Sequence, residues 1–129
     1  MSENFTIEII SPDKTILKTE TNEAVIPSFE GEMGILKDHI SLITFLRPGL
    51  INVKGDKERN FFVEDGTVEF SKNNLLILTT TAKELSDLSK DSIDNLIAES
   101  EKTLSDEKIS DKEKYLLYYK LQTLKNINR

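Results

Sequence analysis

The hydrophobic pattern of the chain changes its period near residue 85. From Phe5 to about Thr81, short runs rich in Ile, Val, Phe and Thr are interrupted by Gly, Pro, Asn and Asp, which is typical of β-strands joined by turns. After Leu85, apolar residues recur at spacings of three, four and seven, which is the period of an amphipathic helix. The sequence therefore predicts an α+β fold in which the strands come first and the helices last.

The strand-rich half consists of short apolar runs bounded by turn residues. The candidate strands span residues 5–10, 15–20, 23–26, 40–46, 50–54, 60–63, 67–70 and 75–78. Turn chemistry lies between them at Pro48-Gly49, Gly55-Asp56, Asp65-Gly66 and Asn73-Asn74. Because each strand has an apolar face to bury, strands at this spacing predict a two-layer antiparallel sandwich or a flattened barrel.

The last third of the chain carries two helical segments. The first has one apolar side, formed by Ile93, Leu96, Ile97 and Leu104. Ser110 and Glu113 fit a capping box, so we expect the second helix to begin at about Asp111. The second helix has a wide apolar stripe, formed by Tyr115, Leu117, Tyr118, Leu121 and Leu124. The short polar connection predicts an antiparallel hairpin, and the chain divides into a sandwich domain at 1–85 and a hairpin at 86–129.

The charge balance and the missing residue types exclude several classes of function. The chain has 23 acidic and 17 basic side chains and a formal charge of -6, which disfavours a general affinity for nucleic acid or anionic lipid. It has no cysteine and one histidine, so thiol chemistry and the usual tetrahedral zinc site cannot be assembled. The first residues fit neither a secretory signal nor a transit peptide. The apolar run at 40–46 is far shorter than the roughly 20 residues that cross a bilayer.

One stretch concentrates the polar residues that could carry chemistry. Glu30, Glu32, Asp38 and His39 come just before the apolar run, together with two glycines. No phosphate-binding glycine loop, zinc-protease motif or nucleophile-elbow motif is present, so catalysis has few candidates. An acid–base cluster and a docking loop both remain open. Gly31 and Gly34 can supply a positive φ or a close backbone approach, and we expect them to fix a tight, rigid loop with an apolar tip at Met33.

A longer ordered pattern surrounds this stretch. Residues 29–36 read Phe-Glu-Gly-Glu-Met-Gly-Ile-Leu, and they are followed by His39, Leu42, Thr44 and Leu46-Arg47-Pro48-Gly49. This pattern resembles the signature of the epsilon subunit of F-type ATP synthases. The resemblance continues at residues 9–12, 65–70 and 73–78, and so covers the whole strand-rich half. It implies a flattened antiparallel β-sandwich of about ten strands followed by a helical hairpin.

The resemblance also implies a function. Members of that family are non-catalytic rotor subunits at the foot of the central stalk, where they hold the gamma shaft and rest on the polar loops of the c-ring. Rotation of the ring is thereby coupled to ATP synthesis elsewhere in the complex. On matching positions, the gamma and c-ring interface falls on Glu30, Gly31, Glu32, Met33, Gly34 and His39. Exposed carboxylates on a stiff turn contribute only about 0–1 kcal/mol each to such a contact, so several must act together.

Two departures from the family pattern have consequences. Lys37-Asp38 stands where the family commonly has Pro-Gly, and Asp65 stands where it often has glycine, so we expect local changes in turn geometry. Some members bind ATP through a motif resembling (Ile/Leu)-Asp-x-x-Arg-Ala in the first helix, and Ile97 occupies the place of its arginine. Isoleucine offers no bidentate contact to phosphate, so we expect weak or absent ATP binding, no cofactor, and a core role for Ile97.

The second helix is basic in an acidic chain. Residues 114–129 contain no acidic side chain and four cations, namely Lys114, Lys120, Lys125 and Arg129. Cations near a helix C-terminus are favoured by about 0.3–1 kcal/mol each through the helix dipole, which requires no partner. The resemblance implies a further role, in which the extended helices bring these cations to acidic segments of the alpha and beta subunits and inhibit ATP hydrolysis.

The rotor interpretation predicts where the chain resides and what it contacts. It implies one copy per complex at the cytoplasmic face of the bacterial inner membrane, with membrane contact only through the complex. Neither nucleic acid nor metal is expected as a partner. Two other interpretations stay open at the level of the residues: an intracellular β-sandwich adaptor for another protein assembly, and a small hydrolase that uses Glu30, Glu32 and His39.

Overall fold

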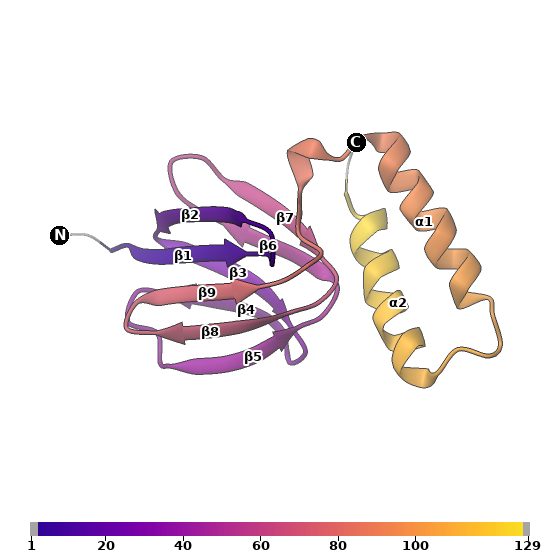
Figure 1. Ribbon diagram of the computed structural model, residues 1–129, viewed down its shortest axis with the longest axis horizontal. Helices are drawn as coiled ribbons and strands as arrows, with labels where there is room; N and C mark the ends of the chain where they lie inside the picture. Colours follow the sequence, from indigo (N-terminus) through magenta and orange to yellow (C-terminus); the bar gives the residue numbers. More distant parts are fainter. Residues whose placement is uncertain (1–2, 128–129) are drawn as a thin grey trace.

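The computed structural model describes residues 3–127. It is a β-sandwich followed by a pair of helices (Figure 1). The strands are β1 (Phe5–Ile10), β2 (Thr15–Thr21), β3 (Glu23–Ser28), β4 (Gly31–Leu36), β5 (Leu42–Leu46), β6 (Gly49–Val53), β7 (Arg59–Val63), β8 (Gly66–Ser71), β9 (Asn74–Leu78) and β10 (Lys83–Glu84). A 3-10 turn, η1 (Leu85–Asp87), leads to the helices α1 (Lys90–Leu104) and α2 (Asp111–Lys125). The predicted fold class is confirmed.

Hydrogen bonds join the strands into one folded sheet. Its order is β10-β7-β6-β3-β5-β8-β9-β1-β2, and β4 pairs with β3 outside this path. One pairing differs from the antiparallel prediction, since β1 and β9 run parallel with Ile7 opposite Leu75. Hydrophobic alternation determines which face of a strand is buried, but it does not determine the neighbouring strand. The sequence therefore predicted most of the strands and not this pairing.

The sandwich core fills the space between the two layers. In β1 the side chains of Phe5, Ile7 and Ile9 are buried, and they alternate with more exposed positions. The sandwich core comprises Phe5, Ile7, Ile9, Leu17, Ala24, Ile26, Ile35, Leu46, Ile51, Val53, Phe61, Val63, Val68, Phe70, Leu75 and Ile77. Full burial of one large apolar side chain contributes about 1.5–3 kcal/mol, so this cluster is the main source of stability.

The two helices begin at serine caps. Ser89 Oγ accepts a hydrogen bond from the Ser92 N–H at 3.1 Å, and Ser110 Oγ accepts one from the Glu113 N–H at 3.1 Å. A cap of this kind stabilises a helix by about 1 kcal/mol. The predicted start of the second helix is confirmed, and Figure 1 shows the helices side by side as a hairpin. Within residues 3–127, neither helix has the length and apolar character needed to cross a membrane.

A second, smaller apolar cluster joins the hairpin to the sandwich. We call it the junction cluster, and it comprises the buried Phe62, Leu88, Ile93 and Leu124 with the half-buried Leu50, Leu85, Leu96, Ile97 and Ile127. Phe62 comes from β7 and Leu50 from β6, so the hairpin is docked on this side of the sandwich. Leu104, which the sequence placed on the apolar side of the first helix, is exposed at the end of α1.

A bidentate ion pair holds the last strand before the helices begin. Arg59 in β7 donates from Nε and Nη2 to the two carboxylate oxygens of Glu84 in β10, at 2.8 and 2.7 Å. These hydrogen bonds lower the pKa of Glu84 below its ordinary value. Since β10 pairs with β7 only at Lys83 and Glu84, the ion pair adds a side-chain contact to a short backbone pairing.

Candidate functional site

The turn between β3 and β4 presents Glu30 at the edge of the sandwich. The buried Ser28 holds the turn, because its Oγ donates to the carbonyl of Gly31 at 2.7 Å and accepts from the Glu30 N–H at 3.2 Å. Gly31 has a φ of +121°, which favours glycine over other residues. A buried serine and a glycine therefore give this acidic turn a fixed shape.

The rest of the predicted loop is a strand. Residues 31–36 form β4 and pair antiparallel with β3, where Gly34 lies opposite Val25. Gly34 does not have a positive φ, and Met33 packs against the sandwich core, so the predicted apolar tip is wrong. Met33 alternates with the exposed Glu32, which is a strand pattern that the two glycines obscured.

His39 follows a residue in the left-handed conformation. Asp38 has a φ of +66°. Its N–H donates to Asn73 Oδ1 at 2.7 Å, and Asn73 Nδ2 donates back to Asp38 Oδ1 at 2.9 Å. Asp38 thus reaches a conformation that glycine adopts readily, which accommodates the departure from Pro-Gly at this position. His39 then packs edge to face against the buried Phe70, with 5.9 Å between the ring centroids.

The polar residues that are close in sequence are separated in space. Glu30 and His39 flank the two ends of β4, and a six-residue strand spans about 17 Å from its first to its last residue. Among residues 3–127, no group of three or more histidine, cysteine or acidic side chains is placed to hold a metal ion. The fold therefore does not assemble Glu30, Glu32 and His39 into one acid–base cluster.

An exposed apolar surface covers the outer side of the sheet at β5 and β9. We call it the β5–β9 apolar face, and it comprises Ile43, Phe45, Leu76 and Leu78, separated across β8 by Thr67 and Glu69. The side chains of Ile43 and Phe45 are 78 % and 60 % exposed. Exposed large apolar side chains on neighbouring strands are typical of a surface that binds another protein.

The sequence of β5 already indicates the β5–β9 apolar face, although the interface predicted from the sequence does not include it. In β5, Leu42 and Leu46 pack toward the sandwich core, whereas Ile43 and Phe45 point outward. A strand of a two-layer sandwich has only one face to bury within its own domain. A strand that is apolar on both faces therefore predicts a partner for the second.

The cations of α2 differ in what they contact. Lys120 Nζ lies 2.9 Å from Glu64 Oε1, and the lysine side chain is 17 % exposed. Lys125 Nζ lies 3.4 Å from Glu101 Oε2 on α1, and both side chains are well exposed. Lys114 is exposed, and Arg129 lies outside the described residues. In the docked hairpin, two of the four predicted inhibitory cations are therefore already paired.

Aromatic contacts also attach α2 to the sandwich. The guanidinium carbon of Arg47 lies 3.8 Å from the ring centroid of Tyr119, a cation–π contact. The rings of Phe29 and Tyr115 stack at 6.0 Å between centroids. The sequence prediction missed both contacts, because their partners are far apart in the chain and only the tyrosines of α2 indicated an aromatic surface.

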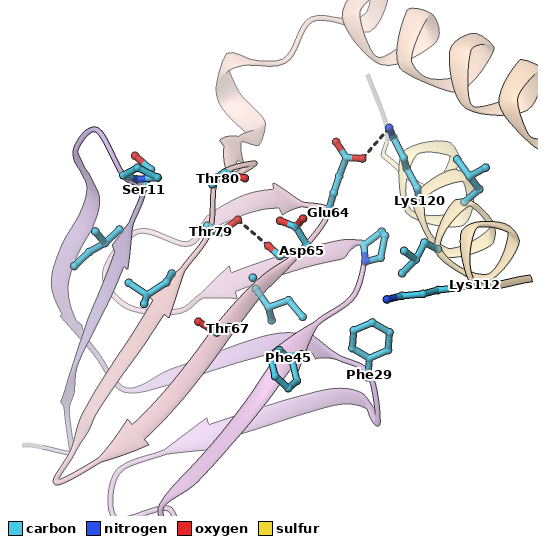
Figure 2. A pocket seen from close by; sticks show the side chains of 18 residues that line it. Ser11, Phe29, Phe45, Glu64, Asp65, Thr67, Thr79, Thr80, Lys112 and Lys120 are labelled. Carbon is cyan, nitrogen blue, oxygen red and sulfur yellow. Dashed lines mark hydrogen bonds and ion pairs between the residues drawn. The ribbon is translucent and has the colours of Figure 1, made fainter. Parts of the chain in front are cut away.

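Two cavities flank α2. The larger, of about 1030 Å³, opens between the end of the sandwich and the N-terminal half of α2. Figure 2 shows Lys112 and Lys120 on its helix side and Phe29, Glu64 and Asp65 on its sandwich side. The smaller, of about 490 Å³, lies on the side of Arg47 and Tyr119. The N-terminal half of α2 is therefore docked with open space beneath it.

The residues that replace the nucleotide motif lie on α1. Ile97 is half-buried against the junction cluster, as expected of a core position, while Asp94 and Asn95 are exposed. An apolar side chain packed in this way leaves the motif without its phosphate-binding group.

Comparison with known proteins agrees with this architecture. A family model described as the ATP synthase delta/epsilon chain β-sandwich domain matches residues 4–85. The chain is 48 % identical to the ATP synthase epsilon chain of Pelagibacter ubique (strain HTCC1062), over 99 % of this chain and 100 % of that one. It is 33 % identical to the ATP synthase epsilon chain of Parvibaculum lavamentivorans, over 98 % and 97 % of the two chains.

The fold is also found in solved structures. A chain of the Euglena gracilis mitochondrial ATP synthase superposes with a TM-score of 0.80 at 19 % identity, over 97 % of this chain and 81 % of that chain. A chain of the Tetrahymena thermophila mitochondrial ATP synthase central stalk and c-ring superposes with a TM-score of 0.68 at 14 % identity. Together with the full-length relatives, the match at residues 4–85 shows that this chain belongs to the family of ATP synthase epsilon chains.

Proposed function

We propose that this chain is a non-catalytic subunit of the central stalk, which couples rotation of the c-ring to ATP synthesis elsewhere in an F-type ATP synthase. Family membership supports this role, and so does the division of the surface into an apolar face and an acidic turn. The observation that carries the proposal is the β5–β9 apolar face, because an isolated domain has no use for exposed Ile43 and Phe45.

The gamma subunit docks on the β5–β9 apolar face. Ile43 and Phe45 would become buried against it, which supplies an apolar centre for the contact. Glu69 lies between Ile43 and Leu76 in the strand register, and so offers a carboxylate within the face. We therefore expect the matching surface of gamma to combine apolar side chains with at least one cation.

The c-ring contacts the acidic turn between β3 and β4. Glu30, Gly31 and the exposed Glu32 lie at this end of β4, where Ser28 restrains the backbone. Met33 and Gly34 support the contact from within the strand. His39 lies at the other end of β4, so it belongs to a separate contact. A restrained turn binds more favourably than a mobile loop, because little conformational entropy is lost when it binds.

The helical hairpin inhibits ATP hydrolysis when it extends. Lys114, Lys120, Lys125 and Arg129 would then face acidic segments of the alpha and beta subunits, where several charge pairs act together. Deletion of residues 86–129 is expected to raise the ATPase activity of the assembled enzyme. Unchanged hydrolysis after this deletion would refute the inhibition and leave the rotor role intact.

The hairpin binds ATP weakly or not at all, because Ile97 cannot contact phosphate. Isothermal titration of the full chain with MgATP should give no measurable heat at micromolar concentrations. A micromolar dissociation constant would overturn this part of the proposal.

The chain acts at the cytoplasmic face of the bacterial inner membrane, with one copy in each complex. The relatives from Pelagibacter ubique and Parvibaculum lavamentivorans support this placement as ATP synthase epsilon chains. The chain reaches the membrane only through its contact with the c-ring. A formal charge of -6 disfavours direct binding to anionic lipid or nucleic acid.

Introducing a charge on the β5–β9 apolar face tests the gamma contact. Ile43→Glu should lower recovery of gamma in an affinity purification by about tenfold or more, because a second carboxylate would be buried beside that of Glu69 in place of an apolar side chain. Lys57→Glu changes an exposed loop position to the same residue and should leave recovery unchanged. Since Ile43 is 78 % exposed, thermal unfolding of both variants should match the parent.

Two results would count against the proposal. Parental recovery of gamma with Ile43→Glu would mean that gamma docks elsewhere. Recovery with the parent of an assembly that lacks alpha, beta and gamma chains would favour the adaptor interpretation.

A further inference from the structure

Three side-chain contacts attach the N-terminal and middle turns of α2 to the sandwich. They are the ion pair of Lys120 with Glu64 at 2.9 Å, the cation–π contact of Arg47 with Tyr119 at 3.8 Å, and the stack of Phe29 on Tyr115 at 6.0 Å. We call these three contacts the α2 clasp. Its sandwich residues come from the β3–β4 turn, the β5–β6 connection and the end of β7, so they approach α2 from separate parts of the sheet.

The α2 clasp borders open space. Phe29, Glu64 and Lys120 line the cavity of about 1030 Å³. Arg47 and Tyr119 line the cavity of about 490 Å³ on the other side. Close-packed apolar contacts, by contrast, lie near the C-terminal turn of α2, where Leu124 enters the junction cluster. The contacts of the α2 clasp can therefore break without opening the junction cluster.

The partner of Lys120 determines what this residue can do. Its ammonium group is neutralised by Glu64 and its side chain is 17 % exposed, so it cannot meet a second acidic partner while α2 is docked. Lys125 differs, because its partner Glu101 lies on the hairpin itself and would move with it. Among the predicted inhibitory cations of α2 that the structure describes, Lys120 is therefore the one that release of the α2 clasp uncovers.

We propose that Glu64 masks Lys120 in the docked hairpin, so that breaking the α2 clasp is what makes this lysine available to inhibit ATP hydrolysis. This inference rests on the proposed function of the hairpin. It adds that docking and inhibition compete for the same ammonium group. Glu64 is then a positioning residue that favours the active enzyme, although it touches no nucleotide.

Docking can be measured in the full chain without the rest of the complex. The sequence has no cysteine, so cysteines introduced at the exposed Asp13 and Glu107 can carry a pair of spin labels. The parent should give mainly one docked distance. Glu64→Gln and Lys120→Gln should each increase the undocked fraction by about threefold to fivefold, as expected for loss of one partly exposed ion pair. As a control, Lys54→Gln removes an exposed ion pair with Glu58 on the surface of the sandwich. It should leave the undocked fraction unchanged.

ATP hydrolysis by the assembled enzyme then distinguishes masking of Lys120 from docking of the hairpin. Glu64→Gln frees the hairpin and leaves Lys120 unpaired, so ATP hydrolysis should fall about twofold or more as the extended population grows. Lys120→Gln frees the hairpin to the same extent but removes the cation, so hydrolysis should not fall. The exchanged pair, Glu64→Lys with Lys120→Glu, should restore docking and still fail to strengthen inhibition.

Three results would each contradict a different part of this proposal. An unchanged docked distance in Glu64→Gln would overturn the α2 clasp. Increased undocking in both variants with equal inhibition would overturn the masking of Lys120. If deletion of residues 86–129 leaves hydrolysis unchanged, the proposed inhibition fails, while the docking measurements in the isolated chain still test the α2 clasp by themselves.

Discussion

The sandwich core and the junction cluster use the same kinds of apolar side chain, but they are held in place differently. Every strand around the sandwich core is also joined to a neighbour by backbone hydrogen bonds. Among residues 3–127, no backbone hydrogen bond joins α1 or α2 to a strand, and the junction cluster has only four buried side chains, the rest being half-buried. A backbone ladder fixes the position of a strand, whereas a side-chain cluster allows a docked element to leave. The sandwich is therefore expected to stay rigid, whereas the hairpin can undock from it.

The largest effect is expected from a cavity in the sandwich core. Phe70 is 1 % exposed and packs edge to face on Phe5 at 5.6 Å. Phe70→Ala should lower the free energy of unfolding by about 3–5 kcal/mol, because it removes buried area and leaves a cavity. Urea denaturation followed by circular dichroism should show strand and helix signals lost together. If the helices survived this change, the hairpin would be more independent of the sandwich than the comparison implies.

A cavity in the junction cluster should give a smaller and more local effect. Leu124 is 1 % exposed and contributes to the contact between hairpin and sandwich. Leu124→Ala should cost about 2–4 kcal/mol, and the loss should fall on docking of the hairpin. Hydrogen exchange should then be faster in α1 and α2 and nearly unchanged in β1 and β9. Equal loss of protection in strands and helices would show that the two regions unfold as one unit.

The sequence predicts the sandwich and the hairpin well because their hydrophobic periods differ and their turns and caps are local. The cap at Ser110 depends on residues within one helical turn, and its position is confirmed. β4 was misjudged because Gly31 and Gly34 suggested a loop, whereas only Gly31 has a positive φ and Met33 still alternates toward the core. A weak strand pattern next to a strong turn signal is ambiguous in sequence alone.

The candidate site is less predictable than the fold, because its contacts join residues that are far apart in the chain. The pairing of Asn73 with Asp38, the stacking of Arg47 on Tyr119 and the parallel pairing of β1 with β9 all depend on the folded topology. The apolar face at Ile43 could have been found, since β5 is apolar on both sides. Folding of the domain does not require a particular residue type at an exposed position. An exposed apolar face is therefore recognised only once the structure shows which face of each strand is buried.

An intermediate effect is expected at the turn that precedes His39. Asn73→Ala removes both hydrogen bonds with Asp38 and places alanine at a φ of +57°, so it should lower the free energy of unfolding by about 1–2 kcal/mol. Asp38→Gly in the same background should recover part of the loss, because glycine adopts the left-handed conformation without support. Urea denaturation midpoints of the single and double variants measure the loss and its recovery. A full loss in the double variant would mean that the side chains, and not the backbone of Asp38, carry the effect.

The smallest effect belongs to the ion pair at the boundary between the two regions. The pKa of Glu84 is lowered by its hydrogen bonds from Arg59, so Glu84 is more acidic in the folded than in the unfolded chain. Its stabilisation is present above the ordinary value of 4.5 and is lost as the pH falls through the lower pKa of the folded state. Glu84→Gln should therefore cost about 1 kcal/mol or less at pH 7, as for a partly exposed pair, and nothing once Glu84 of the parent is protonated in both the folded and the unfolded state. Urea midpoints measured in parallel for the parent and Glu84→Gln should converge on acidification. Equal urea midpoints at pH 7 would show that β10 is held by packing, and that the boundary resembles the sandwich core more than the releasable hairpin.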